Sequence, residues 1–327
     1  AIMKTMVSEL GYEHSSFHSP AVVAEMDAEL EGENEFVGVG IYILPQMVKD
    51  QVTLISVMPD SPAEHGGLKA HDAILTVDDY PIVNNGDLYI YLVRGLECSA
   101  TVLTVKSPGQ EPRQIMLIRE RIQSPSLIEA RLVPTTDGSR VGYIFIPSFF
   151  DRTLPQQIED ALTNFGPLDG LILDNRMNGG GSSDVVEPIL SFFTAGTLGQ
   201  FVSREESRPF IINPNTIHNS QDVPLVVLVG QDTASFGEIF SGVLQDSGRA
   251  KIVGQTSPGN VETLHGYTFD DGSRMWIAEE KFVPAVSQAN WEETGIVTDV
   301  QAYADWDTFT FETDPSVAAA LTVLGHQ

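Results

Sequence analysis

The second half of the chain repeats one pattern, in which a short apolar run precedes a longer stretch that is predicted to be helical. The apolar runs are LDGLILDNR (168–176), VPLVVLVG (223–230) and AKIVGQT (250–256). Runs of this length, rich in valine, leucine and isoleucine, are typical of strands buried on both faces of a sheet. Alternation of such strands with helices predicts an α/β layer with parallel strand pairings.

A different pattern occupies residues 36–121, where short strands alternate with glycines. FVGVGIYIL and QVTLISVM are predicted strands, DSPAEHGGL (60–68) a capped helical turn, and GDLYIYLVRGL (86–96) an amphipathic helix. Residues 1–30 are predicted to form two short helices around a polar segment. The sequence therefore predicts a small β-rich domain between a helical N-terminal segment and the α/β layer.

The chain is strongly acidic, with 45 acidic and 18 basic residues and a formal net charge of −27. Such a surface repels nucleic acids and anionic membranes, so binding to a phosphate backbone is disfavoured. No run of about 18 apolar residues exists, so we expect no membrane-spanning segment. The seven histidines lack metal-ligand spacing, and we expect no metal and no cofactor. The single cysteine, Cys98, excludes an intrachain disulfide and is predicted to be a buried thiol.

Two segments of the small region resemble the PDZ domains of bacterial proteases, FVGVGI (36–41) and VMPDSPAEHGGLKAHDAILTVDD (57–79). By this resemblance, the loop that binds the C-terminal carboxylate of a peptide is formed by Val37, Gly38, Val39 and Gly40. The glycines let backbone N–H groups approach a carboxylate, and the strand that follows can pair with an extended peptide. A structural β-domain with an occluded groove is the alternative.

The stretch after the second apolar run is the most informative for chemistry. A predicted buried strand ends at Gly230, and Ser235 opens a helix after a short loop. A hydroxyl in this place lies at the carboxyl end of a strand and at the positive end of a helix, where backbone N–H groups can hold an oxyanion. Ser235 and Glu238 also form S-x-x-E, a capping box that needs no catalysis, so the residues alone leave both interpretations open.

The segment TASFGEIFSGVLQDSGRAKIVG (233–254) is similar to the nucleophile segment of the C-terminal-processing (tail-specific) proteases, peptidase family S41. LILDNRMNGGG (171–181) resembles the L-I-x-D-x-R-x-N-x-G-G element of the same family. The resemblance implies that Ser235 is the nucleophile and that the N–H groups of Gly180 and Phe236 hold the oxyanion.

The resemblance also implies a fold and a set of domain boundaries. The fold is an α/β protease core of the ClpP/crotonase-like type with an inserted PDZ domain. The implied boundaries are 1–35 for an N-terminal helical segment that completes the protease core, 36–121 for the PDZ domain, and 122–327 for the protease core.

The chain departs from the tail-specific pattern at the general base. That branch uses a lysine in a T-x-G-K-G segment, and the position of this lysine is occupied here by Asn260. An amide does not take up a proton near neutral pH, so the Ser–Lys dyad is absent. Either the chain is a catalytically inactive, peptide-binding S41-like scaffold, or another base serves Ser235.

The tricorn-type and chlamydial-type branches of the fold are similar in using Ser–His–Glu, and their histidine lies in an N-terminal segment resembling D-x-H-[ST]. The matching segment is YEHSSF (12–17), which makes His14 the candidate base. An imidazole is suited to this role because it titrates near the working pH. His18 and His265 are the alternative candidates.

A histidine base needs an acceptor at its second ring nitrogen. The segment WEETGIVTD (291–299) resembles the E-x-x-G-V-x-P-D element of the family, with threonine in place of proline. Glu292 aligns with the acid, and Glu293 is the alternative one residue further along.

The sequence therefore predicts a serine endopeptidase that cleaves polypeptides by acyl-enzyme chemistry, with the PDZ domain binding substrate C-termini. The expected partners are polypeptide substrates and not nucleic acid, and a homo-oligomer is left open. The family is mostly extracytoplasmic in bacteria, and the chain begins as though inside a helix. We therefore expect a periplasmic, secreted or cell-surface protein from which an export or anchor segment has been removed.

Overall fold

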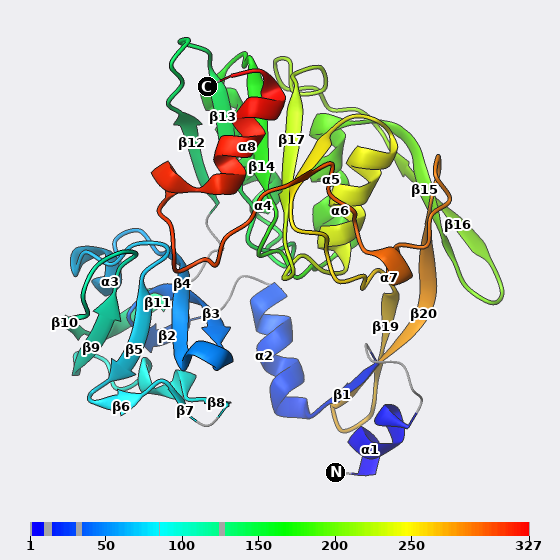
Figure 1. The fold of residues 1–327 in the computed structure, drawn as a ribbon. Helices are drawn as coiled ribbons and strands as arrows, with labels where there is room; N and C mark the ends of the chain where they lie inside the picture. Colours follow the sequence, from blue (N-terminus) through cyan, green and yellow to red (C-terminus); the bar gives the residue numbers. More distant parts are fainter. Residues whose placement is uncertain (1, 10–14, 31–34, 85, 124–127, 327) are drawn as a thin grey trace. The chain divides into compact units, whose positions relative to one another are not determined.

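The computed structural model describes residues 2–9, 15–30, 35–84, 86–123 and 128–326 (Figure 1). The chain divides into two compact units. The first, called the core unit here, comprises residues Ala1–Gly32, Pro125–Tyr303 and Ser316–Gln327. The second, called the small unit, comprises Glu33–Ser124 and Ala304–Pro315, so a late stretch of the chain belongs with the predicted PDZ segment.

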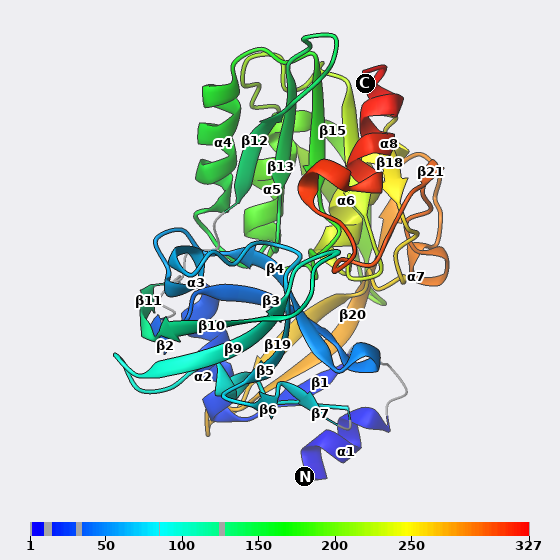
Figure 2. The same cartoon turned by 60° about the vertical axis from the view of Figure 1, so that its left-hand side comes forward.

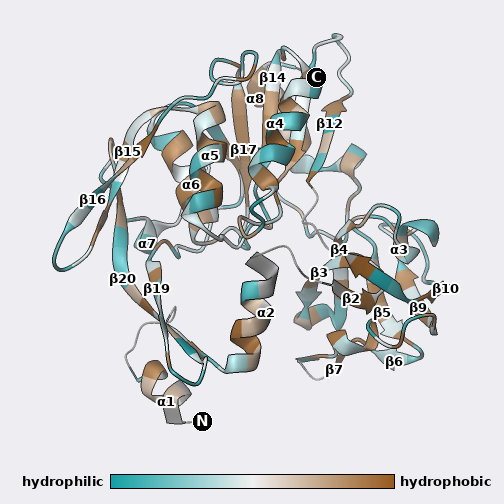
Figure 3. Cartoon of the chain, turned by 180° about the vertical axis from the view of Figure 1, so that it is seen from behind, coloured by the Kyte–Doolittle hydropathy of each residue, from teal (hydrophilic) through white to brown (hydrophobic). Residues whose placement is uncertain are grey.

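The core unit is built on a six-stranded sheet. Its strands, in spatial order, are β12 (Glu129–Val133), β13 (Val141–Phe145), β14 (Gly170–Asp174), β17 (Leu225–Val229), β18 (Lys251–Gly254) and β21 (Val300–Gln301). The pairings from β13 to β21 are parallel and β12 is antiparallel to β13. The predicted parallel layer is therefore confirmed. Every residue of β14 and β17 is buried, and Figure 3 shows β17 as hydrophobic.

Helices cover both faces of this sheet. The helices are α4 (Leu154–Phe165), α5 (Ser183–Phe193), α6 (Phe236–Asp246) and α8 (Pro315–Leu324). The first three form one buried cluster with alternate strand residues, which include Leu171 and Val227. On the opposite face, the Leu324 side chain of α8 lies 3.1 Å from where a Cβ of Gly170 would be. Figure 2 shows α4 and α8 on opposite sides of β13.

A second, antiparallel sheet joins the N-terminal segment to the rest of the core unit. Its strands run in the order β1 (Ser16–His18), β20 (Arg274–Pro284), β15 (Gly196–Val202) and β16 (Ser207–Ile212), and β19 (Thr263–Thr268) also pairs with β20. The short helices α1 (Ile2–Ser8) and α2 (Pro20–Leu30) flank β1. Arg274 donates two hydrogen bonds, of 2.8 and 3.0 Å, to the Asp27 carboxylate, which ties α2 to β20.

The small unit has its own sheet and its own core. The strand order is β10 (Arg113–Ile118), β9 (Ala100–Lys106), β5 (Ala73–Val77), β4 (Gln51–Val57) and β3 (Ile41–Gln46), and β6 (Tyr80–Pro81) pairs with β5. Two smaller pairs are β2 (Glu35–Gly38) with β11 (Glu120–Gln123), and β7 (Val83–Asn84) with β8 (Asp87–Leu88). The predicted capped turn is α3 (Pro62–His65), and the Ser61 hydroxyl accepts the Glu64 N–H. The short 3₁₀ turn η1 (Met47–Lys49) joins β3 to β4.

The predicted helix over residues 86–96 is wrong. The structure forms β8 and then a single 3₁₀ turn, η2 (Ile90–Leu92). Four of the five residues from Tyr89 to Val93 are aromatic or β-branched, and such residues are weaker helix formers than leucine or alanine. The buried Arg119 guanidinium donates to the carbonyl of Leu92 at 2.8 Å and of Val93 at 3.4 Å, so these carbonyls have a partner outside any helix.

The prediction that Cys98 is buried is also wrong. The Cys98 side chain is exposed and its residue has φ 62°. Its N–H donates to the carbonyl of Arg119 at 2.9 Å, which fixes the backbone in a turn. The side chain therefore points out of the turn, although its neighbours along the sequence are apolar.

Residues 304–315 belong to the small unit, and an aromatic cluster packs them against its other segment. The Trp306 and Phe309 rings each lie 4.5 Å, between centroids, from the ring of His71, and all three residues are buried. The Trp306 indole N–H donates to the carbonyl of Leu54 at 3.0 Å, and the Trp306 carbonyl accepts from His71 Nδ1 at 2.8 Å. This segment, which includes η3 (Phe311–Thr313), is therefore part of the folded small unit.

Removal of the Trp306 ring should destabilise the protein strongly. We expect Trp306→Ala to lower the free energy of unfolding by about 3 to 5 kcal/mol, as for other large-to-small changes in a core. Urea unfolding followed by circular dichroism measures this. Tyr303→Ala is the matched control, because that ring is 60% exposed and its loss should cost little. Equal losses in the two variants would contradict the packing role of Trp306.

Candidate active site

Ser235 lies at the turn between β17 and α6 with an unusual backbone conformation. Its φ is 53° and its ψ is −126°, a region that non-glycine residues rarely adopt. Such a conformation costs on the order of 1–3 kcal/mol and is typical of functional turns. The Ser235 side chain makes no capping hydrogen bond, so the capping-box interpretation is wrong. Its hydroxyl is left at the positive end of α6.

The glycine run after β14 lies directly against Ser235. A Cβ on Gly180 would lie 2.7 Å from the Ser235 Cβ and 3.1 Å from the Phe236 nitrogen, and the φ of Gly180 is 101°. Only glycine fits this position without displacement of the nucleophile. In the described part of the chain, the Phe236 N–H has no acceptor. The Gly180 N–H donates to Asn178 Oδ1 at 2.9 Å.

A buried ion pair fixes the strand end from which this run departs. Asp174 is fully buried, and its carboxylate accepts from Arg176 Nε at 2.9 Å and from Nη2 at 2.6 Å. The Tyr143 hydroxyl donates to the same carboxylate at 2.7 Å. A charge-assisted pair with a further donor is a strong restraint in a buried place. The D-x-R spacing of the sequence therefore serves to position the backbone that follows.

Glu238 lies fully buried in the first turn of α6 and holds the loop in which Asn260 lies. Its carboxylate accepts the Ser257 hydroxyl at 2.6 Å, the Gly259 N–H at 2.8 Å and the Asn260 N–H at 2.7 Å. Burial raises the pKa of Glu238, and these donors oppose that rise. The sequence marked this residue as a possible cap and as part of the family-like segment 233–254, and predicted no contact between it and the 257–260 loop.

The same loop connects Ser235 to Glu292. The Ser235 N–H donates to the carbonyl of Asn260 at 2.6 Å, and the next residue, Val261, donates its N–H to Glu292 Oε2 at 2.7 Å. Glu292 lies in α7 (Trp291–Thr294) and is partly buried, whereas Glu293 is exposed. The acid predicted from the sequence is thus brought to the loop that contacts the nucleophile.

The predicted base, His14, lies outside the described residues. His18 Nε2 is 2.9 Å from the Ser16 hydroxyl, and His265 Nε2 is 3.3 Å from Glu280 Oε2. Across the ranges that the structure describes, no histidine ring is hydrogen-bonded to Ser235. The structure therefore places Gly180 beside Ser235 and joins Ser235 to Glu292 through residues 260 and 261. The catalytic roles of these three residues, like that of His14, stay predictions.

The predicted peptide-binding loop lies in the small unit, at the start of β3. Val37 and Gly38 pair with β11, whereas Val39 and Gly40 lie between β2 and β3. In the described part of the small unit, the N–H groups of Val39 and Gly40 have no acceptor. β3 is the last strand of its sheet, so its outer edge is unpaired within the described residues.

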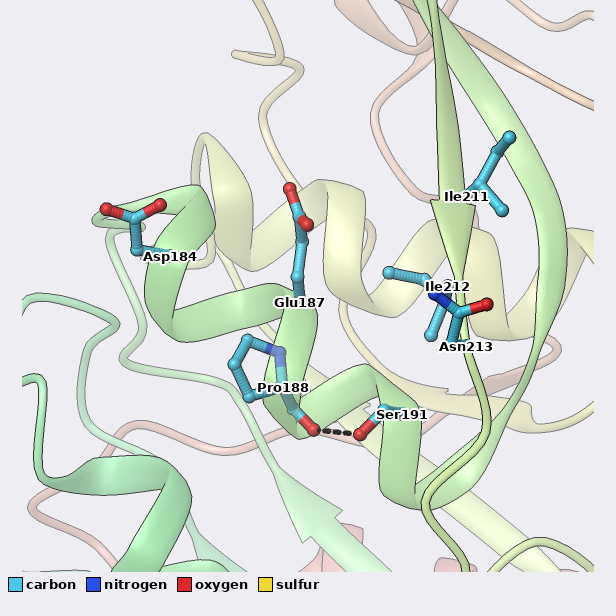
Figure 4. A pocket seen from close by; sticks show the side chains of 7 residues that line it. All are labelled: Asp184, Glu187, Pro188, Ser191, Ile211, Ile212 and Asn213. Carbon is cyan, nitrogen blue, oxygen red and sulfur yellow. Dashed lines mark hydrogen bonds between the residues drawn. The ribbon is translucent and has the colours of Figure 1, made fainter.

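A separate cavity of about 320 Å³ lies between α5 and β16 (Figure 4). It is lined by Asp184, Glu187, Pro188, Ser191, Ile211, Ile212 and Asn213. Burial raises the pKa of Glu187. None of the residues predicted for catalysis or peptide binding lines this cavity.

A strained serine at a strand–helix turn, with a glycine run against it, is an arrangement typical of serine hydrolases. The core unit belongs to peptidase family S41, since residues 140–302 match the model of that family. The family resemblance and the predicted α/β protease core are thereby confirmed.

Named relatives agree with the family. The chain is 31% identical over 271 residues to a carboxyl-terminal-processing protease of Picosynechococcus sp., covering 80% of this chain and 63% of that protein. It is 29% identical over 285 residues to a protein of the same name from Synechocystis sp., covering 86% of this chain and 65% of that protein. The chain thus spans less than two thirds of either relative.

A solved structure shows the same fold. The photosystem II D1 C-terminal processing protease superposes with a TM-score of 0.60 and 23% sequence identity, covering 96% of this chain and 84% of that one. At this identity the match bears on the fold, and the chemistry has to be argued from the residues of this chain.

Proposed function

We propose that this chain is a serine endopeptidase that cleaves polypeptides through an acyl-enzyme, with Ser235 as the nucleophile. The observation that carries the proposal is the strained Ser235 turn, where the hydroxyl makes no capping hydrogen bond and Gly180 lies against both the Ser235 Cβ and the Phe236 nitrogen. Strain of this kind is kept where the surrounding structure holds it for a function.

In the proposed reaction, the Ser235 Oγ attacks the carbonyl carbon of a peptide bond while its proton passes to His14. The carbonyl oxygen becomes an oxyanion, which accepts hydrogen bonds from the N–H groups of Phe236 and Gly180. His14 then protonates the leaving amine as the C–N bond breaks, and an acyl ester remains on Ser235. A water molecule, deprotonated by His14, hydrolyses this ester and frees the serine.

Glu292 is the acid that we propose to orient the imidazole. Its carboxylate is held by the N–H of Val261, next to the residue that accepts the Ser235 N–H. Glu293 is exposed and would have to give up solvation to serve the same role. These contacts support Glu292 as the third member of a Ser–His–Glu set.

Labelling with a fluorophosphonate tests the proposed function. The Ser235 Oγ should displace fluoride from phosphorus, and mass spectrometry of a digest should find the adduct on Ser235. Ser235→Ala should abolish the adduct. If the parent protein shows no adduct at any pH from 5 to 10, even with peptide present, the inactive peptide-binding scaffold is the better account.

We propose that the small unit is a PDZ domain that binds the C-termini of substrates. Among the described residues, the N–H groups of Val39 and Gly40 have no acceptor and the outer edge of β3 is unpaired, and both observations support this mode. A peptide with a free, apolar C-terminus should bind with a Kd on the order of 1–10 µM. Isothermal titration calorimetry measures this, and amidation of the peptide should abolish binding. Equal binding of both peptides would contradict capture of a carboxylate.

Gly40→Ala should weaken that binding at least about tenfold. A Cβ at Gly40 would lie 2.3 Å from the Ser61 Cβ, and the residue has φ 81°, so the loop must shift. Gly67→Ala is the matched control, since Gly67 has φ 76° but open space around it. If both variants bind the peptide as the parent does, the loop is not the binding site.

We further propose that the protein acts outside the cytoplasm of a bacterium, by the family resemblance. Within the described ranges, no helix is both long and apolar enough to cross a membrane. Immunoblotting of cell fractions tests the proposal, and recovery of the whole protein in the cytoplasmic fraction would contradict it.

A further inference from the structure

Asn178 is a fully buried residue whose side chain is only half satisfied. Its Oδ1 accepts the N–H of Gly180 at 2.9 Å, and its backbone carbonyl accepts the N–H of Ala234 at 3.0 Å. The Nδ2 group is buried and has no partner among the described residues. The atom of the Asn178 amide that faces the Gly180 N–H must be the oxygen, because an N–H donor needs an acceptor. The NH₂ group is therefore the buried group without a partner among the described residues.

This contact bears on the oxyanion hole. A Cβ on Gly180 would meet both the Ser235 Cβ and the Phe236 nitrogen, so the backbone of Gly180 borders the reacting centre. Its N–H is nevertheless used by Asn178 Oδ1, whereas the N–H of Phe236 has no acceptor among the described residues. In this state the Phe236 N–H is available to an oxyanion, whereas the Gly180 N–H is hydrogen-bonded to Asn178.

The local sequence permits the second donor to be released. Gly179, Gly180 and Gly181 are consecutive, and glycine passes between positive and negative φ without a steric penalty. A flip of the peptide between Gly179 and Gly180 exchanges the directions of its N–H and its C=O. The Gly179 carbonyl would then face Asn178, and rotation of the amide would let the unsatisfied Nδ2 donate to it. The unpaired donor thus gains a partner only in the flipped state.

We propose that Asn178 is a positioning residue that selects between these two orientations of the 179–180 peptide. Its Oδ1 holds the Gly180 N–H in the resting chain, and its Nδ2 holds the flipped peptide when an anionic tetrahedral centre forms on Ser235. This inference rests on the proposed function, because it concerns the oxyanion hole of that reaction.

The Gly180 N–H can be observed directly in the full chain. Of the 28 glycines, only Gly67, Gly180 and Gly181 follow another glycine. Protein labelled with ¹³C-carbonyl and ¹⁵N glycine therefore gives three signals in a carbonyl-to-amide correlation spectrum. Gly179→Ala identifies the Gly180 signal by its loss, and a Cβ at Gly179 would meet nothing within 4 Å. The Gly67 signal serves as the internal reference, because it belongs to the small unit.

Phosphonylation of Ser235 places a phosphoryl oxygen where the oxyanion would be. We expect the Gly180 signal to move on phosphonylation while the Gly67 signal stays in place. An adduct on Ser235 with an unmoved Gly180 signal would overturn the role of Asn178 and leave the proposed function standing. The absence of any adduct would overturn both.

Asn178→Asp supplies a kinetic test, because a carboxylate keeps the acceptor and removes the donor. We expect kcat for a peptide substrate to fall at least about tenfold, with KM within about twofold, since substrate binding does not use this residue. Circular dichroism of the Asn178→Asp protein, compared with that of the parent, checks that the variant is folded. Asn178→Asp protein that folds and turns over at the parent rate would contradict the proposal.

Discussion

Replacing His14 with alanine should slow the phosphonylation of Ser235 about 10³-fold. A positioned general base contributes on the order of 10²–10⁴ in rate, and an unassisted serine hydroxyl is a poor nucleophile. Labelling reactions are quenched at a series of times and analysed by intact-protein mass spectrometry. This gives the rate constants for the parent and the variant.

Asn260→Ala is the matched control for the base. Asn260 contacts Ser235 and Glu238 through its backbone carbonyl and N–H, which alanine keeps. The labelling rate of the Asn260→Ala variant should stay within a few-fold of the rate of the parent. If His14→Ala labels at the parent rate while His18→Ala or His265→Ala does not, the base is one of the alternatives and Ser235 remains the nucleophile.

The pH dependence separates a histidine base from an amine base. With a histidine, the labelling rate should fall as the pH drops through about 6 to 7, where a free imidazole takes up a proton and can no longer accept one from Ser235. A lysine base would lose activity at a higher pH, because even a desolvated amine titrates above an imidazole in most sites. A rate that is flat from pH 5 to 9 would contradict a histidine base.

Glu238→Ala should both destabilise the protein and abolish its activity. The change leaves the Ser257 hydroxyl and the N–H groups of Gly259 and Asn260 without their acceptor, and each unsatisfied buried donor costs about 1–3 kcal/mol. We expect the free energy of unfolding to fall by at least about 3 kcal/mol, as measured by urea unfolding. Activity should fall because the carbonyl of Asn260 positions the N–H of Ser235.

Two further variants separate the hydrogen bonds from the loss of charge. Glu238→Gln keeps the shape but sets an NH₂ group against one of the three donors, so its stability should be intermediate. Glu293→Ala removes an exposed carboxylate and should change stability by less than about 0.5 kcal/mol. If Glu238→Ala unfolds at the parent urea concentration, the buried carboxylate does not hold the loop.

The parallel sheet could be predicted because its signal is local. Each strand is a continuous apolar run, and β14 and β17 are buried at every residue, so no alternation with polar residues hides them. The position of Ser235 after β17 followed from the same signal. Its φ of 53° could not be foreseen, because the S-x-x-E pattern is equally typical of an ordinary helix cap.

The wrong predictions depend on residues distant in the sequence. Whether residues 86–96 form a helix is decided in part by Arg119, which binds the carbonyls of Leu92 and Val93. Cys98 is exposed because the same residue fixes its backbone in a turn. Hydrophobic periodicity reflects only residues that are near in the sequence. It therefore predicts a helix for residues 86–96 and burial for Cys98 from the apolar residues around them.

The role of Glu238 was missed for a related reason. Its partners lie about 20 residues further along the chain, in a loop that the sequence marked only by the change from lysine to Asn260. Glu238 lies among apolar residues of a predicted helix, and a carboxylate buried there needs hydrogen-bond donors. This requirement was the one sign in the sequence that Glu238 has partners elsewhere in the chain. The identity of those donors is set by the fold.

Because residues 304–315 belong to the small unit, this unit cannot finish folding until late in the synthesis of the chain. Residues 33–124 leave the ribosome about 180 residues before Trp306 does, which corresponds to a delay on the order of 10 s at ordinary rates of translation. During that interval His71 and the carbonyl of Leu54 lack the aromatic ring and the indole N–H that cover them in the finished fold. Completion of the small unit is therefore a late event in biosynthesis, and an early termination would leave the nascent small unit with an open apolar site that chaperones can bind.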